Sequence, residues 1–296
     1  MNADAFQVIT DRIVGLLESG VVPWQKPWQG GAGMPRNLIS KKEYRGINTF
    51  LLHAMMYENP FWLTFNQAKQ LGGHVKQGEK ACPVVFWKWL DLEDSESTTG
   101  KKRVPFLRYY SVFNLAQCEG IPVDKLPVID GGKREHTPIA EAEQIVAAMP
   151  KRPQIENKWQ RAFYSPAGDF VGMPAPESFR SVEDYYSVLF HELTHSTGHE
   201  SRLNRKGVTG SEGQWSPFGS QLYSQEELVA EMGAAFLCGQ VGIVERTIDN
   251  SAAYIKSWLE RLKDDRKLVI YAAAQAQKAA DFILGRQHAE EQEVAA

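Results

Sequence analysis

Residues 181–199 read Ser-Val-Glu-Asp-Tyr-Tyr-Ser-Val-Leu-Phe-His-Glu-Leu-Thr-His-Ser-Thr-Gly-His, and they indicate how the C-terminal half is built. Ser181 and Asp184 form a capping-box pattern at the start, and a glycine near the end supplies a stop. The stretch therefore predicts a helix. His191 and His195 stand four residues apart on one face of that helix, a spacing at which two imidazoles can hold one divalent metal ion.

Glu192 completes the His-Glu-x-x-His pattern that is typical of zinc peptidases. The metal in such a site lowers the pKa of a bound water, and a neighbouring carboxylate accepts the water's proton. The pattern predicts His191 and His195 as ligands and Glu192 as the general base. The alternative is a pair of partly buried structural histidines, and the glutamate between them favours the metal.

A third ligand is expected from a second helix over residues 223–237, where Glu227 and Glu231 share one face. Ser201 occupies the place at which a metzincin has its third histidine, so that subclass is disfavoured. His199 is a weaker alternative ligand because it follows the glycine stop. We expect Glu227 as the third ligand, with Glu231 supporting a ligand histidine.

The two glutamates could also exchange roles. Ser224 and Glu227 satisfy a capping-box pattern of their own, in which Glu227 binds backbone amides. Glu231 would then be the metal ligand.

An aromatic and basic segment near the N-terminus is the candidate surface for single-stranded nucleic acid. Flat rings allow bases to stack while cations neutralise phosphates. The candidate contacts are Trp24, Lys26, Trp28, Arg36, Lys41, Lys42, Tyr44 and Arg45. In the alternative, Trp24 and Trp28 pack the loop against the core and the lysines face water.

The composition is that of an ordinary folded protein with an uneven charge distribution. The 296 residues are 43% hydrophobic and carry a net charge of −3. Residues 1–110 hold 14 lysines and arginines against 10 aspartates and glutamates, so the acidic excess lies in the remainder. Such asymmetry is typical of nucleic-acid-binding chains. The length favours two domains, with a Pro- and Gly-rich junction between residues 1–130 and 136–296.

The expected fold class is α+β. The N-terminal domain should be α/β, with an opening helix over residues 4–20, a helix over residues 64–71 and a small antiparallel sheet. Segments 84–90 and 106–113 are rich in β-branched and aromatic residues and predict the two arms of a hairpin. The C-terminal domain should be mostly helical, and the apolar spacing over residues 249–286 indicates a helical bundle core.

Neither a membrane-spanning segment nor a secretory signal is expected, because the apolar runs are short. The three cysteines are too few and too scattered for a disulfide framework, and they predict small buried side chains in a reducing compartment. We therefore expect a cytoplasmic protein.

Several of these segments together resemble the ArdC-type antirestriction proteins of conjugative plasmids, whose N-terminal domain is similar to that of TraC-type plasmid primases. The resemblance covers most of the chain. It depends on segments 20–28, 44–48, 62–68, 72–78, 110–120 and 162–165, on the helix with His191, Glu192 and His195, and on the helix over residues 223–237.

The resemblance implies an N-terminal domain that binds single-stranded DNA and a C-terminal zincin-like metallopeptidase domain, which together protect incoming plasmid DNA from host restriction. Zinc is the expected metal, and two histidines with a carboxylate can also hold manganese. A host protein would be the peptidase substrate. In the alternative, the chain is a protective module that covers single strands, and its metal site is structural or vestigial.

Overall fold

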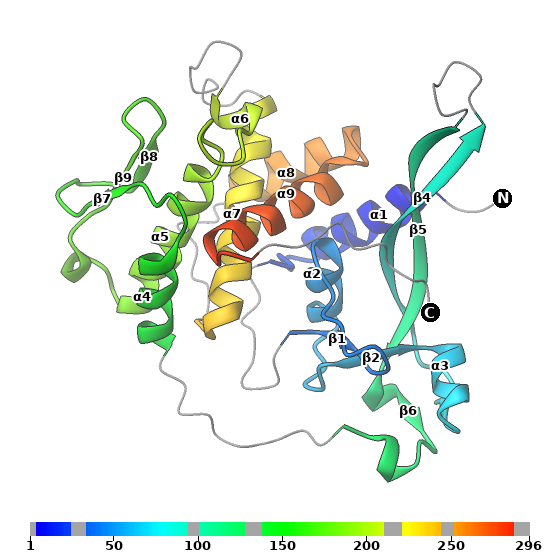
Figure 1. The fold of residues 1–296 in the computed structure, drawn as a ribbon. Helices are drawn as coiled ribbons and strands as arrows, with labels where there is room; N and C mark the ends of the chain where they lie inside the picture. The colour runs from blue at the N-terminus through cyan, green and yellow to red at the C-terminus, as the bar shows by residue number, and fades with distance from the viewer. Residues whose placement is uncertain are drawn as a thin grey trace.

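The computed structural model describes residues 4–24, 34–93, 101–127, 138–209, 221–243 and 252–286. Within these ranges the chain forms α-helices and small sheets that lie in two regions (Figure 1). The predicted α+β class is confirmed, because helices and small sheets occur in both regions.

The N-terminal region begins with a helix and continues into a mixed sheet. Its elements are α1 (Ala5–Glu18), β1 (Arg36–Asn37), α2 (Ile47–His53), β2 (Phe61–Thr64), α3 (Phe65–Gln70), β3 (His74–Val75), β4 (Cys82–Glu93), β5 (Lys101–Asn114), η1 (Leu115–Gln117), β6 (Cys118–Glu119) and η2 (Val123–Lys125). Asp4 caps α1 by accepting a hydrogen bond from the backbone N–H of Phe6 (3.0 Å). Ile9, Ile13 and Leu17 bury one stripe of this helix, as the 3.6-residue period predicts.

The main sheet has the strand order β1-β2-β5-β4. Strands β4 and β5 pair in antiparallel register from Cys82 opposite Val112 to Glu93 opposite Lys101, which confirms the predicted hairpin and lengthens it. Figure 1 shows this hairpin as a long two-stranded arm. The acidic stretch over residues 94–100 lies outside the described residues. Strands β1 and β2 run parallel, so the sheet is not purely antiparallel.

Helix α2 is attached to the sheet at Asn48. The Asn48 side chain donates to the carbonyl of Val85 and accepts from its N–H, both at 2.7 Å. Gly46 begins the helix with φ 57° and ψ −136°, a backbone conformation that is open to glycine because it has no Cβ. Residues 44–48 (Tyr-Arg-Gly-Ile-Asn) therefore attach the start of α2 to strand β4.

The C-terminal region is mostly helical. Its elements are α4 (Pro138–Ala148), β7 (Gln154–Glu156), β8 (Phe163–Ser165), β9 (Phe170–Gly172), η3 (Pro176–Ser178), α5 (Val182–Ser196), α6 (Lys206–Thr209), α7 (Gln221–Val241), α8 (Ala252–Asp264) and α9 (Leu268–Ile283). Its sheet has the order β7-β9-β8 and packs against α5. The buried side chains of Tyr164 and Val171 lie on the same face, because they are register partners.

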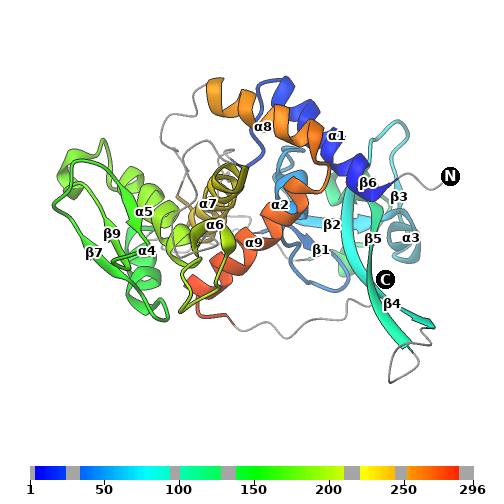
Figure 2. The same cartoon turned by 90° about the horizontal axis from the view of Figure 1, so that it is seen from above.

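The two regions share one continuous core. Helix α1 packs against α8, and the two lie side by side in Figure 2. The rings of Phe50 and Phe236 stack with their centroids 4.6 Å apart, which joins α2 to α7. Residues 131–135, which join the two predicted domains, lie outside the described residues. The division into 1–130 and 136–296 stays a prediction.

The predicted bundle core over residues 249–286 forms in α8 and α9. Trp258, Leu262, Val269 and Ile270 are buried. The described cysteines are free thiols, and two of the three are buried. In the ranges that the structure describes, no helix is both long and apolar enough to cross a membrane.

Candidate metal centre

The His-Glu-x-x-His segment lies in α5, as the sequence predicts. Ser181 caps the helix by accepting a hydrogen bond from the N–H of Asp184 (3.1 Å), which is one half of the predicted capping box. The imidazoles of His191 and His195 lie one turn apart, with ring centroids separated by 4.8 Å. Helix α7 packs along α5 (Figure 1). Its carboxylates approach the two imidazoles.

Three side chains from these two helices converge. The Nε2 atoms of His191 and His195 are 3.1 Å apart. An Oε atom of Glu227 lies 3.6 Å from the first of these nitrogens, and its other Oε lies 3.5 Å from the second. All three side chains place a ligand atom within 4.8 Å of the others.

These separations fit a single metal ion. Ligand atoms at roughly 2.0–2.1 Å from a tetrahedral zinc ion lie about 3.4 Å from one another. The two Nε2 atoms are 3.1 Å apart, and each lies 3.5 or 3.6 Å from a different oxygen of the Glu227 carboxylate, so the three groups are spaced close to that value. Two imidazoles and one carboxylate also leave a position open for water or substrate. The donor set and its spacing therefore suit a catalytic type of metal site.

The other candidate ligands do not belong to this converging set of three. Helix α7 begins at Gln221, so Ser224 is inside the helix and the alternative in which Ser224 and Glu227 form a capping box does not occur. His199 lies beyond α5, and its Nδ1 is 2.9 Å from the hydroxyl of Ser201. Glu231 is buried on α7, with Oε1 3.9 Å from Nδ1 of His191. That position matches a supporting carboxylate, since Nδ1 is the ring atom opposite the converging Nε2.

A fourth carboxylate near the site, Glu226, was not predicted from the sequence. Its Oε1 lies 3.4 Å from Nδ1 of His195, and its side chain is 3% exposed. The guanidinium of Arg205 contacts both of its oxygens. The adjacent pair Glu226–Glu227 could have indicated a second carboxylate at the site. Neighbouring residues of a helix point about 100° apart, so two adjacent glutamates can contact two different histidines of one metal centre. The sequence contains no local signal for Arg205, which comes from a short polar segment after α5.

The site concentrates negative charge and shifts the pKa values of its imidazoles. Burial disfavours protonated His195, but attraction to Glu227 and hydrogen bonds to Glu226 and Glu227 outweigh it and raise the pKa to about 10. Burial likewise opposes protonation of His191, and a hydrogen bond to Glu227 still raises its pKa. Burial acts against the Glu227 anion, yet the two imidazoles hold its pKa well below the usual range. A positive charge at this centre is strongly favoured.

Glu192 is buried beside the cluster, with 6% of its surface exposed. Burial raises the pKa of its carboxyl, and the histidines and a backbone hydrogen bond from Tyr164 moderate the rise. A carboxylate whose pKa is raised toward neutrality is suited to accept a proton. Burial also raises the pKa of Glu231, to about 7. The pKa values of Glu192 and Glu231 are thus raised, whereas that of Glu227 is lowered and Glu227 stays ionised.

The candidate DNA contacts take several different positions. The Trp24 side chain is fully buried, packed edge-on against Phe50 and Trp258 at centroid distances of 6.3 and 5.4 Å. Tyr44 is 6% exposed, and its ring lies 6.2 Å from that of Phe86. Neither ring can stack on a base in this conformation, because core side chains cover both. Trp24 therefore occupies the core position that the alternative predicts.

Four of the basic candidates lie in the part of the chain that the structure describes. Arg36 lies 3.3 Å from the carboxylate of Glu43, and Arg45 forms an ion pair with Asp281 of α9. Lys41 and Lys42 are exposed. The remaining candidates, Lys26 and Trp28, lie outside the described residues.

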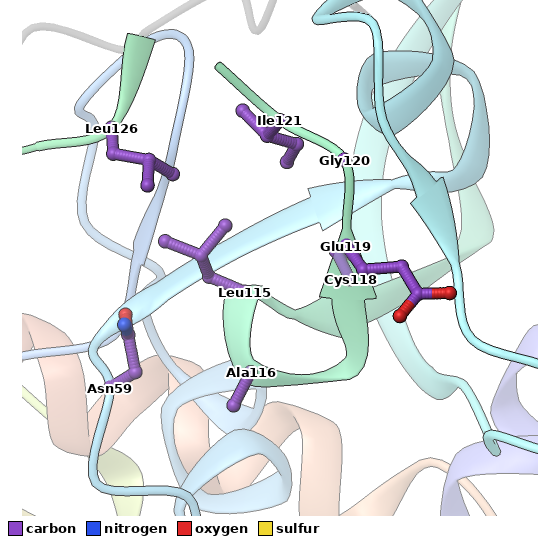
Figure 3. Close-up of a pocket in the computed structure, with 8 residues that line it drawn as sticks. All are labelled: Asn59, Leu115, Ala116, Cys118, Glu119, Gly120, Ile121 and Leu126. Atoms are coloured by element: carbon purple, nitrogen blue, oxygen red, sulfur yellow. The ribbon is translucent and has the colours of Figure 1, made fainter. Parts of the chain in front are cut away.

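A separate hollow of about 360 Å³ lies in the N-terminal region near β6. Leu115, Ile121 and Leu126 surround it, with the Glu119 carboxylate at one side (Figure 3). The lining is mainly apolar, and the Glu119 carboxylate pairs with the exposed His74 (2.9 Å). The three converging candidate ligands lie elsewhere, between α5 and α7.

The fold and the ligand geometry define a class of protein. Residues 140–275 match the family of zincin-like metallopeptidases, and residues 3–113 match the N-terminal domain of the anti-restriction factor ArdC. The chain is thus a zincin-like domain joined to an ArdC N-terminal domain.

Solved structures and curated relatives agree with this class. The metal-free crystal structure of antirestriction ArdC protein from plasmid R388 superposes with a TM-score of 0.74 at 36% identity and covers 97% of this chain and all of that one. The Mn(II)-bound structure of that protein gives 0.73 at 37% identity, over 95% of this chain and 97% of its own. This chain belongs to the ArdC family of antirestriction proteins.

Two sequence relatives extend the comparison. The uncharacterized protein y4eC of Sinorhizobium fredii (strain NBRC 101917 / NGR234) is 33% identical over 96% of this chain and 92% of its own length. A DNA primase TraC of Escherichia coli is also 33% identical over 96% of this chain. The chain spans about a quarter of that primase, since the match covers 27% of it.

Proposed function

We propose that this chain is a cytoplasmic antirestriction protein that binds single-stranded DNA with its N-terminal region and carries a metallopeptidase-type centre in its C-terminal region. It protects incoming conjugative plasmid DNA from host restriction. The observation that carries the enzymatic part is the convergence of His191, His195 and Glu227 on one point, with Glu192 buried beside them.

His191, His195 and Glu227 would hold the metal, with zinc as the default and manganese as the alternative supported by the Mn(II)-bound ArdC relative. Such an ion supplies Lewis-acid chemistry and lowers the pKa of a bound water. Glu192 would take a proton from a water at the centre and give it to the leaving amine of the cleaved peptide bond. Glu226 and Glu231 lie beside the Nδ1 atoms of His195 and His191, at 3.4 and 3.9 Å, where carboxylates can orient the histidine rings. The substrate is a peptide bond in a host protein.

The DNA-binding part is supported by charge and by kinship. The N-terminal region carries a basic excess, and Lys41 and Lys42 are exposed within its candidate surface. A TraC relative is named as a DNA primase. Exposed lysines contribute to binding by displacing counterions from phosphates, without reading sequence.

Glu192→Gln tests the enzymatic part. The variant should bind metal like the parent, because Glu192 is not a ligand, and it should lose cleavage and plasmid protection. His195→Ala should lose the metal as well. Glu183→Gln, at an exposed position on the same helix, is the matched control. Elemental analysis and a plasmid-transfer assay give the two readouts. If Glu192→Gln protects plasmids as well as the parent does, the metal centre is structural and protection comes from DNA coverage alone.

Lys41→Ala with Lys42→Ala tests the DNA-binding part. Affinity for a single-stranded oligonucleotide should fall, and the slope of log K against log salt should become shallower by about 1.4, or 0.7 for each lost phosphate contact. Lys206→Ala with Lys278→Ala removes the same charge from exposed positions in the C-terminal region. Equal losses in both double variants would argue against a localised surface.

A further inference from the structure

The loop after α5 places a buried guanidinium behind the metal centre. Arg205 is 8% exposed and lies between the end of α5 and the start of α7. Its Nε is 3.1 Å from Oε2 of Glu226, and its Nη2 is 2.5 Å from Oε1. This is a bidentate ion pair, the geometry in which an arginine holds a carboxylate in one orientation.

Arg205 also forms hydrogen bonds with the C-terminal end of α5. Its Nη1 donates to the hydroxyl of Thr197 (2.6 Å), and its Nη2 donates to the carbonyl of Thr194 (2.8 Å). A cation at the C-terminal end of a helix also interacts favourably with the helix dipole. The guanidinium therefore links the last turn of α5 to the Glu226 carboxylate of α7.

Gly198 makes this approach possible. A Cβ at this position would fall 2.4 Å from a methyl carbon of Val208 and 3.2 Å from Nη2 of Arg205. Val208 is fully buried, so it has little space to yield. The glycine after the histidine motif thus does more than end the helix, because it lets the loop fold back under the site.

Glu226 connects the arginine to a candidate ligand. Its Oε1, which Arg205 holds, is the same atom that lies 3.4 Å from Nδ1 of His195. The Nε2 of that ring faces His191 and Glu227. A carboxylate at Nδ1 selects the tautomer whose Nε2 carries a free lone pair and also fixes the plane of the ring.

We propose that Arg205 is a positioning residue of the metal centre: by clamping Glu226 it orients His195, and it thereby sets the affinity of the site for a divalent cation. The inference rests on the proposed metal site. Arg205 touches neither metal nor substrate. Without it, Glu226 loses the cation that fixes both of its oxygens and turns away from the position that orients the ring.

Arg202 supplies a matched control from the same loop. Its side chain is 1% exposed and forms an ion pair with Asp169. Its Nε donates to the carbonyl of Ser196 at the end of α5 (2.7 Å). Arg202 thus resembles Arg205 in side-chain burial, pairing and helix contact, but its carboxylate partner Asp169 is not one of the groups that contact His191, His195 or Glu227.

The test measures Mn(II) affinity by calorimetry on the full chain, with folding monitored by urea unfolding. Arg205→Met should weaken Mn(II) binding 10- to 100-fold, the usual effect of losing an outer partner of a ligand. Arg205→Lys keeps the charge but cannot make the bidentate contact to Glu226, and it should restore part of the affinity. Arg202→Met should lose stability but keep an affinity near that of the parent.

The double variant Arg205→Met with Glu226→Gln removes both buried charges and avoids an unpaired ion. Its affinity should equal that of Glu226→Gln alone, because the arginine acts through Glu226. An additive loss in the double variant, an unchanged affinity in Arg205→Met, or an equal loss in Arg202→Met would overturn the inference. If the parent chain itself does not bind Mn(II), the proposed metal site fails first.

Discussion

Gly233 of α7 lies directly against Thr194 of α5. A Cβ built on this glycine would fall 2.4 Å from Cγ2 of Thr194 and 2.7 Å from its hydroxyl oxygen. Both positions are buried: Thr194 is 0% exposed, and the residues on either side of Gly233, Met232 and Ala234, are also 0% exposed. The two helices that carry the candidate ligands can therefore approach closely only because one of them has no side chain at this point.

Gly233→Ala should push α5 and α7 apart. Overpacking of this kind costs about 1–3 kcal/mol in the free energy of unfolding, and the ligand atoms should separate, so Mn(II) binding should weaken as well. Urea unfolding and calorimetry measure the two effects. Gly15→Ala is the control, because no atom lies within 4 Å of its added carbon and it sits on the exposed side of α1. That variant should gain roughly 0.5–1 kcal/mol. A stable Gly233→Ala protein with parental affinity would contradict the close-contact argument.

Glu227→Ala and Glu231→Ala should differ in kind. Loss of Glu227 removes one of three converging ligands and should abolish measurable binding of Mn(II) or Zn(II). Loss of Glu231 removes a neighbour of His191 and should weaken binding 10- to 100-fold without abolishing it. Calorimetry separates these results, with exposed Glu183→Ala as the control. The reverse order of effects would make Glu231 the ligand.

Trp24 should contribute to stability and not to DNA affinity. Trp24→Ala should lower the free energy of unfolding by about 3–5 kcal/mol, as is usual for a fully buried indole. Trp24→Phe should remain folded and bind a single-stranded oligonucleotide like the parent. Trp159→Ala, where the ring is 39% exposed, should cost less. A folded Trp24→Phe variant that has lost DNA binding would return this ring to the nucleic-acid surface.

His53 should make the protein less stable in mild acid. Burial lowers the pKa of His53 to about 4. The unfolded chain, with a histidine pKa of about 6.5, binds more protons between these values, so the stability contributed by neutral His53 is lost as the pH falls from 6.5 to 4. The loss at pH 5 is on the order of 2 kcal/mol. Comparing urea unfolding of His53→Gln and the parent at pH 7.5 and 5 isolates this effect, and exposed His74→Gln is the control. An identical pH dependence in the parent and His53→Gln would rule it out.

The elements that the sequence predicts well are those with local signals. Helix α5 with its N-cap, the opening helix α1 and the hairpin of β4 and β5 were each predicted from spacing or composition within one segment. All three are present in the structure. His191 and His195 lie together because four residues make one helical turn. Glu227 joins them through the packing of α7 on α5, and its role as a ligand stays a prediction.

Contacts between residues that are far apart in the sequence could not be predicted from local patterns. Trp24 is covered by Trp258, a residue of α8 that lies far along the chain, so its burial could not be inferred from the loop that contains it. Arg45 shows the same limit, because its partner Asp281 belongs to α9. Arg205 has an unremarkable sequence context, and only the folded loop brings its guanidinium to Glu226.

The packing of α1 on α8 has a consequence for synthesis on the ribosome. Helix α1 ends at Glu18 and α8 begins at Ala252, so more than two hundred amino acids are polymerised before the partner helix exists. At bacterial elongation rates of roughly 5–20 residues per second, the side of α1 that α8 covers waits on the order of ten seconds or longer for its partner, whereas β4 and β5 can pack against the helix sooner. A chain cut short before α8 should therefore leave part of the apolar stripe of α1 exposed to water.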